Sequence, residues 1–256
     1  MATLVQPAQP VTLYVNKHCP YSHRVWWALE HCKADYQRFI IDPSNRPAWY
    51  RREVTSSGKV PIIAYGGPVV PADEPSDDSV KIPESAVLLE FVADLFPESN
   101  LMPKDPVQRA KVKLFMHTAA TSYIPQYLSF LMRDGPLDEV LFGLQMLQEQ
   151  LPIEGRGEWL LGDQLSIGDI AVAPFLPRME LAFGNDLGAY APGEGTEAFN
   201  YLRNDPGMKR YRQYVDAINA NEGFQKSFDI EHVKKFFTAK LNYLREARRA
   251  TQGLGL

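Results

Sequence analysis

The residue with the clearest chemical potential in this sequence is Cys19, in the segment Cys19-Pro20-Tyr21-Ser22. It follows a strand-like apolar run, and proline is favoured at the first position of a helix, so Cys19 is predicted to be the N-cap residue of a helix. Its sulfur would then face free backbone N–H groups and the positive end of the helix dipole, which both stabilise negative charge. We therefore favour a working thiolate over a small apolar filler at the end of a strand.

The other cysteine, Cys32, is too far along the chain to form a disulfide with Cys19. A dithiol redox protein has its second cysteine where this chain has Ser22. Thirteen residues of helix would separate Cys32 from Cys19 by about 20 Å, beyond the ~7 Å limit between the Cα atoms of a disulfide. A mixed disulfide on Cys19 must therefore be resolved by an external thiol, for which glutathione is the candidate, and Cys32 is predicted to lie in the core.

The spacing of the histidines argues against a metal site. Cys19 and His23 could share a helix face, but His31 lies roughly 12 Å further along the helix axis than His23. Four ligands therefore could not converge on one tetrahedral zinc ion, and we expect no metal.

Composition and charge place the chain among ordinary globular proteins. Its 256 residues are 45% apolar and 23% charged, which allows one large domain or, as we favour, two smaller ones. A net charge of −4 argues against a nucleic-acid partner. The opening residues do not resemble an export signal and no apolar run is long enough to span a membrane, so we expect a cytoplasmic protein.

The chain is expected to divide at a proline-rich segment over 97–106, with mixed strand and helix periodicity before it and helical periodicity after it. The first part is predicted to contain strands at 11–15, 36–42, 60–65 and near 79–82 and helices at 20–33, 45–54 and 85–96. The second part is predicted to contain helices within 107–134, 137–150 and 165–176 and a final helix at about 230–250. A capping box of Ser166 and Asp169 marks the start of the helix in 165–176. The segments 66–79 and 184–200 are predicted to be long surface loops.

Five segments of the chain together resemble the cytosolic glutathione transferases, specifically the omega class. They are CPYSHR at 19–24, NRPAWY at 45–50, KVPII at 59–63, PES at 83–85 and GDQLSIGDIAVAPF at 162–175, in the order and approximate spacing of that family. The resemblance implies an α/β thioredoxin-like domain over 1–97 that binds glutathione. It also implies an all-α helical-bundle domain over 106–256 that contributes a second-substrate pocket, and a homodimer.

The resemblance assigns glutathione-binding roles to several residues of the first domain. Val60 and Pro61, joined by a cis peptide bond, would pair their backbone groups with the cysteinyl part of glutathione like an added strand. Glu84 and Ser85, at a helix start, would bind the γ-glutamyl ammonium and carboxylate groups. Arg46 stands where omega proteins usually have a lysine that reaches the glycyl carboxylate.

Further residues are candidates by position. Tyr21 and Lys59 are expected to border the tripeptide. His23 could favour the thiolate, as could its neighbour Arg24, but both could simply face solvent or a partner subunit. A second-substrate pocket would draw on the helical domain, and its candidates are Tyr123 and Tyr127, although such aromatic residues are more often part of a core.

Together these features predict a glutathione-dependent thioltransferase or reductase. The Cys19 thiolate would take glutathione from a mixed disulfide or a reactive carbon, and a second glutathione would then release it. The resemblance implies deglutathionylation, dehydroascorbate reduction or glutathionyl-ketone reduction, with a small hydrophobic or disulfide-containing acceptor. The alternatives are a non-catalytic carrier that binds apolar small molecules between its domains, and an interaction module.

Overall fold

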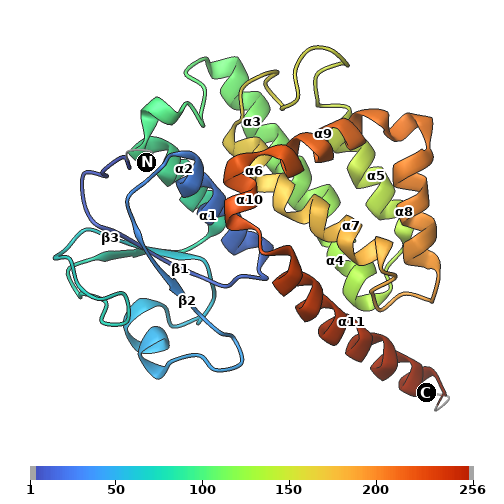
Figure 1. The fold of residues 1–256 in the computed structure, drawn as a ribbon, viewed down its shortest axis with the longest axis horizontal. Coiled ribbons are helices and arrows are strands. Elements are labelled where there is room, and N and C mark those ends of the chain that lie inside the picture. Colours follow the sequence, from blue (N-terminus) through green and yellow to red (C-terminus); the bar gives the residue numbers. More distant parts are fainter. Residues whose placement is uncertain (1–3, 254–256) are drawn as a thin grey trace. The chain divides into compact units, whose positions relative to one another are not determined.

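The structure of this protein is a computed structural model that describes residues 4–253, with side chains described for 4–250. The described chain divides into two compact units (Figure 1). The first contains the residues up to Pro103 together with Glu222–Asp229. The second contains Lys104–Asn221 and the residues from Ile230 onward.

The first unit is built on a four-stranded mixed sheet with the strand order β2-β1-β3-β4. Its strands are β1 (Val11–Val15), β2 (Gln37–Ile40), β3 (Ile62–Tyr65) and β4 (Val80–Ile82). β1 pairs with β2 in parallel, placing Tyr14 opposite Phe39, whereas the β1–β3 and β3–β4 pairs are antiparallel. Because parallel strands need a crossover connection, α1 (Pro20–His31) joins β1 to β2. It packs beside α2 (Ser85–Leu95) on one face of the sheet (Figure 1).

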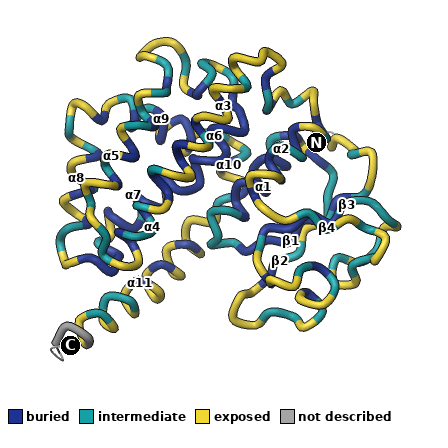
Figure 2. Tube along the Cα trace, turned by 180° about the vertical axis from the view of Figure 1, so that it is seen from behind, coloured by how far each residue is buried: buried dark blue, intermediate teal, exposed yellow. Residues whose placement is uncertain are grey.

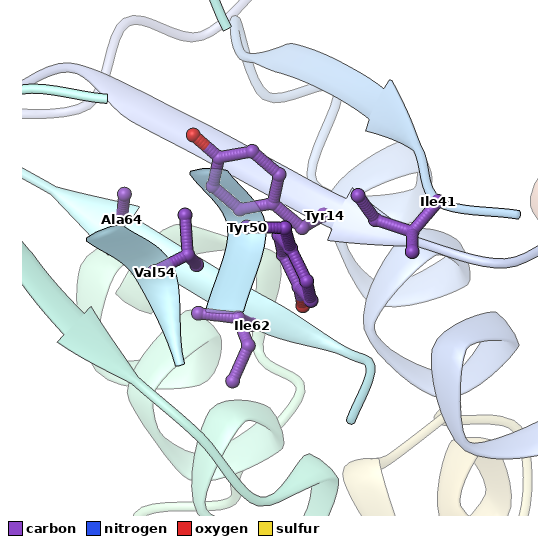
Figure 3. Packing of buried hydrophobic residues seen from close by; sticks show 6 residues of the cluster. All are labelled: Tyr14, Ile41, Tyr50, Val54, Ile62 and Ala64. Atoms are coloured by element: carbon purple, nitrogen blue, oxygen red, sulfur yellow. The ribbon is translucent and has the colours of Figure 1, made fainter. Parts of the chain in front are cut away.

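An aromatic cluster covers the opposite face of the sheet. Tyr14 and Ile62 extend from the sheet toward the short π-helical turn Tyr50–Val54 (Figure 3). The ring centroids of Tyr14 and Tyr50 are 5.6 Å apart. The Tyr50 hydroxyl donates a 2.7 Å hydrogen bond to the carbonyl oxygen of Lys59. The cluster therefore fixes the chain just before β3 begins.

One segment from the C-terminal part of the chain belongs to the first unit. The helix α10 (Glu222–Ser227) packs against α1, where His23 is only 1% exposed. The His23 ring centroid lies 4.8 Å from that of Phe224 and 5.3 Å from that of Phe228, and its Nε2 is 2.9 Å from Ser227 Oγ. The sequence places this segment in the helical domain, and the packing around His23 is the physical reason that it joins the first unit.

The second unit consists of helices joined by loops, and its described residues form no strand longer than an isolated bridge. Its helices are α3 (Pro106–Thr118), α4 (Ile124–Arg133), α5 (Leu137–Gln148), α6 (Ile167–Val172), α7 (Leu176–Gly184), α8 (Glu194–Asn204), α9 (Lys209–Ala220) and α11 (Ile230–Gly253). α11 buries one narrow face, formed by Val233, Phe237 and Leu241, and most of the rest of the helix is exposed (Figure 2). Within residues 4–253 no helix, α11 included, is long and apolar enough to cross a membrane.

The predicted fold class, an α/β thioredoxin-like part followed by an all-α part, is confirmed. Two predicted elements differ from the structure. The helix expected over 45–54 is mostly the π-helical turn Tyr50–Val54. The prediction of a loop over 184–200 is wrong from Glu194 onward, because α8 begins there. Within that segment Tyr190 is buried and stacks on Phe130, with ring centroids 4.5 Å apart, so tertiary packing overrides the glycine-rich composition.

A buried carboxylate holds the predicted capping box at the start of α6. Asp169 accepts hydrogen bonds from the backbone N–H groups of Leu160 and Ser166, at 2.9 Å each. It also accepts from the Ser166 hydroxyl at 2.7 Å and from the Tyr214 hydroxyl at 2.9 Å. Burial raises the pKa of Asp169, and the four donors act against that rise. This carboxylate therefore ties three separate segments of the second unit together.

Replacing this carboxylate should destabilise the helical unit. Asp169→Ala should lower the free energy of unfolding by about 3 kcal/mol or more, because it leaves several buried donors without an acceptor. Urea unfolding followed by circular dichroism measures the effect, and Asp163→Ala, at an exposed position of the same loop, is the matched control. Equal unfolding midpoints for Asp169→Ala and the wild type would contradict this account.

Candidate active site

A pocket of about 430 Å³ in the first unit brings together most of the residues predicted to hold glutathione. It is lined by Tyr21, Ser57, Lys59, Val60, Pro61, Ile62, Pro83, Glu84 and Ser85. Two of the predicted site residues of this unit, the glutathione-binding candidate Arg46 and the catalytic candidate Cys19, are not part of this lining. Ser57, Ile62 and Pro83 were not predicted as binding residues, although Ile62 and Pro83 lie within the KVPII and PES segments and Ser57 is two residues before Lys59.

Cys19 is the N-cap residue of α1 and Pro20 is the first helical residue, as the sequence predicts. Cys19 has extended backbone angles and is half-buried. Its carbonyl oxygen accepts a 3.1 Å hydrogen bond from the N–H group of His23, which closes the first helical turn. The thiol itself makes no capping hydrogen bond.

The turn before Cys19 is fixed by Asn16, a residue for which the sequence carries no distinct signal. The Asn16 side chain donates a 2.9 Å hydrogen bond to the carbonyl oxygen of Ile41 and accepts one of 3.0 Å from the N–H group of His18. The Asn16 backbone N–H group donates to the Ser22 hydroxyl at 3.2 Å. Ser22 is fully buried, so the residue in the place of a second cysteine serves to hold the turn.

The segment before β3 is held in place by the aromatic cluster. The Val60–Pro61 peptide bond is cis, as the resemblance implies. The carbonyl group of Lys59 is held by the Tyr50 hydroxyl, and the Val60 side chain packs against the cluster. The backbone around Val60 is therefore supported by both a hydrogen bond and apolar packing where it lines the pocket.

Arg46 lies beside the pocket, against the backbone of Gly58. This glycine has a φ of 66° and stands between two residues of the lining. A Cβ atom built on Gly58 would lie 3.2 Å from Arg46 Nη1 and 2.8 Å from Arg51 Nε. Arg46 Nε is buried without a hydrogen-bond partner in the described part of the chain. Among residues 4–250 no ion pair involves either arginine, so their charges are available to an anion.

Glu84, the N-cap residue of α2, has a backbone conformation that is rare for residues with side chains. Glu84 has a φ of 71° and a ψ of 107°. A non-glycine residue in so sparsely populated a region costs of order 1–3 kcal/mol, and such strain is concentrated at binding sites. The pocket lined by Glu84 is therefore a candidate binding site on backbone grounds as well.

A buried arginine stands behind this end of the pocket. Arg24 is 6% exposed, and its Nη1 donates a 3.0 Å hydrogen bond to the Ser85 hydroxyl oxygen. Its guanidinium carbon lies 5.0 Å from the centroid of the Tyr21 ring. Burial lowers the pKa of Arg24 to about 10, which leaves the guanidinium charged at neutral pH. Arg24 therefore faces neither solvent nor a partner subunit, which were the alternatives open from the sequence.

Tyr123 and Tyr127, the candidates for a second-substrate pocket, are buried in the second unit. Their rings stack with centroids 6.0 Å apart, and the Tyr123 hydroxyl lies 3.5 Å from Met179 Sδ. Burial raises the pKa of both hydroxyl groups. The Tyr127 hydroxyl is buried and has no hydrogen-bond partner within the described residues. A role for either tyrosine in a second-substrate pocket stays a prediction.

Comparison with known proteins adds family information to this geometry. The family model "Glutathione S-transferase, N-terminal domain" matches residues 18–95, and "Glutathione S-transferase, C-terminal domain" matches residues 138–217. Glutathione transferase Omega 1C from Trametes versicolor is a solved structure with 39% sequence identity and a TM-score of 0.88. The match covers 92% of this chain and 98% of that one.

Two further relatives are more distant. The solved dehydroascorbate reductase from Chlamydomonas reinhardtii is 25% identical, with a TM-score of 0.59, and the match covers 91% of this chain and 98% of that one. "Probable glutathione S-transferase DHAR1, cytosolic" from Oryza sativa subsp. japonica is 28% identical over 225 residues, which are 88% of this chain and 91% of that protein. The two family models together cover more than half of the chain, and the match to Omega 1C extends over nearly all of it. This chain therefore belongs to the glutathione transferase family, and its structural neighbours include members of the omega class.

Proposed function

We propose that this protein is a glutathione-dependent thiol transferase or reductase whose Cys19 carries glutathione as a mixed disulfide. The observation that supports this most is the position of Cys19, half-buried at the N-cap of α1, the helix that also supplies Tyr21 to the pocket. A tyrosine or serine hydroxyl in this place would hold the thiolate of glutathione for conjugation. A cysteine instead forms a disulfide with glutathione.

The proposed reaction proceeds by two thiol–disulfide exchanges. The Cys19 thiolate attacks the glutathione sulfur of a mixed disulfide, the S–S bond breaks, and the acceptor leaves as a thiolate that takes up a proton. A second glutathione, as its thiolate, then attacks the glutathione sulfur bound to Cys19. Glutathione disulfide leaves and the Cys19 thiolate is restored. In sum, one mixed disulfide and one glutathione give one acceptor thiol and one glutathione disulfide.

The residues around the pocket match the chemical groups of glutathione. The backbone at Val60 can pair with the cysteinyl unit like an added strand. The Glu84 carboxylate suits the γ-glutamyl ammonium group, and the Ser85 hydroxyl at the start of α2 suits the γ-glutamyl carboxylate. Arg46, with Arg51 beside it, suits the glycyl carboxylate, which a guanidinium group can bind through two hydrogen bonds.

The acceptor is proposed to be a small hydrophobic or disulfide-containing molecule. A relative of solved structure is named a dehydroascorbate reductase, which supports a small oxidised acceptor for this chain as well. A homodimer and a cytoplasmic location are proposed with it. The alternative, a carrier that binds apolar small molecules between its domains, has no role for the reactivity of Cys19, so substitution of this residue separates the two functions.

Removal of the thiol should abolish the reaction. Cys19→Ser is expected to lower the rate of glutathione-dependent reduction of a small mixed disulfide by at least about a hundredfold, because the nucleophile is lost. Cys32→Ala is the matched control and should keep the activity. Full activity of Cys19→Ser would contradict the proposal, and a wild type that is inactive and takes up no glutathione would favour the carrier.

The two cysteines should differ sharply in reactivity. Cys32 is 6% exposed, and burial raises the pKa of its thiol to about 11, with a hydrogen bond to Ser99 acting in the opposite direction. At pH 8 the Cys32 thiol should therefore stay protonated and unreactive. Iodoacetamide followed by peptide mass spectrometry should show one adduct, on Cys19, and a second adduct only in urea. Comparable labelling of both residues in the native protein would contradict the assignment of Cys32 to the core.

Arg46 should bind the glycyl carboxylate of glutathione. Arg46→Gln is expected to raise the KM for glutathione about tenfold, because a charge-assisted hydrogen bond is lost. The KM for the glycyl ethyl ester of glutathione, which lacks that carboxylate charge, should stay nearly unchanged. Arg52→Gln is the control, since Arg52 is exposed and paired with Glu53. Equal effects of Arg46→Gln on both thiols would show that Arg46 does not bind this carboxylate.

A further inference from the structure

The hydrogen bond between Arg24 and Ser85 can run in only one direction. Arginine carries N–H donors and no acceptor, so the Ser85 oxygen must accept from Arg24 Nη1. A serine hydroxyl also has one hydrogen to donate. Among the residues that the structure describes, no acceptor takes that hydrogen from Ser85. Because Ser85 lines the pocket, the hydrogen is left for an acceptor on a bound ligand.

Arg24 is also a fixed positive charge directly behind the pocket wall. It contacts two residues of the lining, the Ser85 hydroxyl through its hydrogen bond and the Tyr21 ring through its guanidinium face. A charge that is buried in this way acts more strongly than one in water, because little solvent screens it. The position suits a negatively charged group of a ligand at the start of α2, where the helix N-terminus adds to the attraction.

We propose that Arg24 is a positioning residue that makes the Ser85 hydroxyl a dedicated donor to the γ-glutamyl carboxylate of glutathione and places a positive charge behind it. The inference rests on the proposed function, because it requires glutathione in this pocket. Arg24 then sets the selectivity of the site for thiols that carry a carboxylate at this end. A purely structural Arg24, joining α1 to α2, would make no such distinction between ligands.

The test compares two ligands that differ only in that carboxylate. They are glutathione and γ-aminobutyryl-cysteinyl-glycine, which lacks the α-carboxylate of the γ-glutamyl unit. Dissociation constants are measured by isothermal titration calorimetry on proteins that all carry Cys19→Ser, so that no disulfide forms. Arg24→Met is compared with Arg24→Lys, which keeps a cation and a donor. Arg38→Met is the control, because the Arg38 guanidinium stacks on Trp26 with its carbon 3.8 Å from that ring centroid.

The expected result is a loss of selectivity rather than a general loss of binding. Arg24→Met should weaken glutathione binding about tenfold or more and change binding of the analogue by less than about twofold. Arg24→Lys should recover part of the preference, and Arg38→Met should leave it unchanged. Adding Ser85→Ala to Arg24→Met should cost little more than either change alone, because both act on the same interaction.

Other outcomes overturn the inference in distinguishable ways. Equal weakening of both ligands by Arg24→Met, or no effect on either, would leave Arg24 a structural residue while the proposed function stands. If Arg24→Met does not fold, the preference for glutathione over the analogue is measured in Ser85→Ala and Arg24→Lys instead. If Ser85→Ala keeps the full preference for glutathione, the inference is overturned. If Ser85→Ala loses this preference and Arg24→Lys keeps part of it, the inference is supported. If the parent protein binds neither thiol, the proposed function itself is wrong.

Discussion

The turn between β1 and α1 is the constraint on which the site depends. Asn16 ties this turn to the chain after β2 through Ile41, and to the first turn of α1 through Ser22. Because these hydrogen bonds are buried, breaking any of them would leave a polar group unpaired. The turn therefore has one favoured conformation, and Cys19 occupies a defined point at the helix N-terminus.

The polar residues that follow Cys19 extend this constraint to the rest of the unit. Ser22, His23 and Arg24 are consecutive and buried, and each contacts a different element. The Ser22 hydroxyl accepts a hydrogen bond from the turn before α1, the His23 ring packs against α10, and Arg24 donates a hydrogen bond to the start of α2. Buried polar groups are costly unless they are paired, so these three contacts select one rotation of α1 about its axis. That rotation places Tyr21 in the pocket lining, beside Ser85.

The sequence predicted the parts of this arrangement that depend on local pattern. Periodicity gave the element order and the division into mixed and helical parts, and the Cys19-Pro20 pair gave the helix start. The family resemblance supplied the residues around Val60 and Ser85. The sequence could not show long-range side-chain contacts, because the residue type of a single asparagine or tyrosine does not tell whether it lies in an exposed loop or in a buried hydrogen-bond network. Asn16 and the link from Tyr50 to Lys59 were missed for this reason.

The same limit explains the errors in the second half of the chain. Glycine, proline and acidic residues near Tyr190 gave a loop-like composition, and only the stacking of that ring on Phe130 shows that part of the segment is core. The sequence of the short helix α10 does not indicate that it packs against α1, because this packing depends on long-range contacts with the His23 ring.

In the proposed reaction glutathione passes through Cys19 rather than directly between the acceptor and the second thiol. A rapid-quench experiment with an isotopically labelled glutathionyl group on a peptide disulfide tests this most directly. Before glutathione is added, one labelled glutathionyl group should appear on Cys19 as one equivalent of peptide thiol is released. Unlabelled glutathione should then convert that group into glutathione disulfide that carries one labelled and one unlabelled half. Labelled glutathione disulfide formed at the full catalysed rate while Cys19 never carries the label would contradict the proposed reaction.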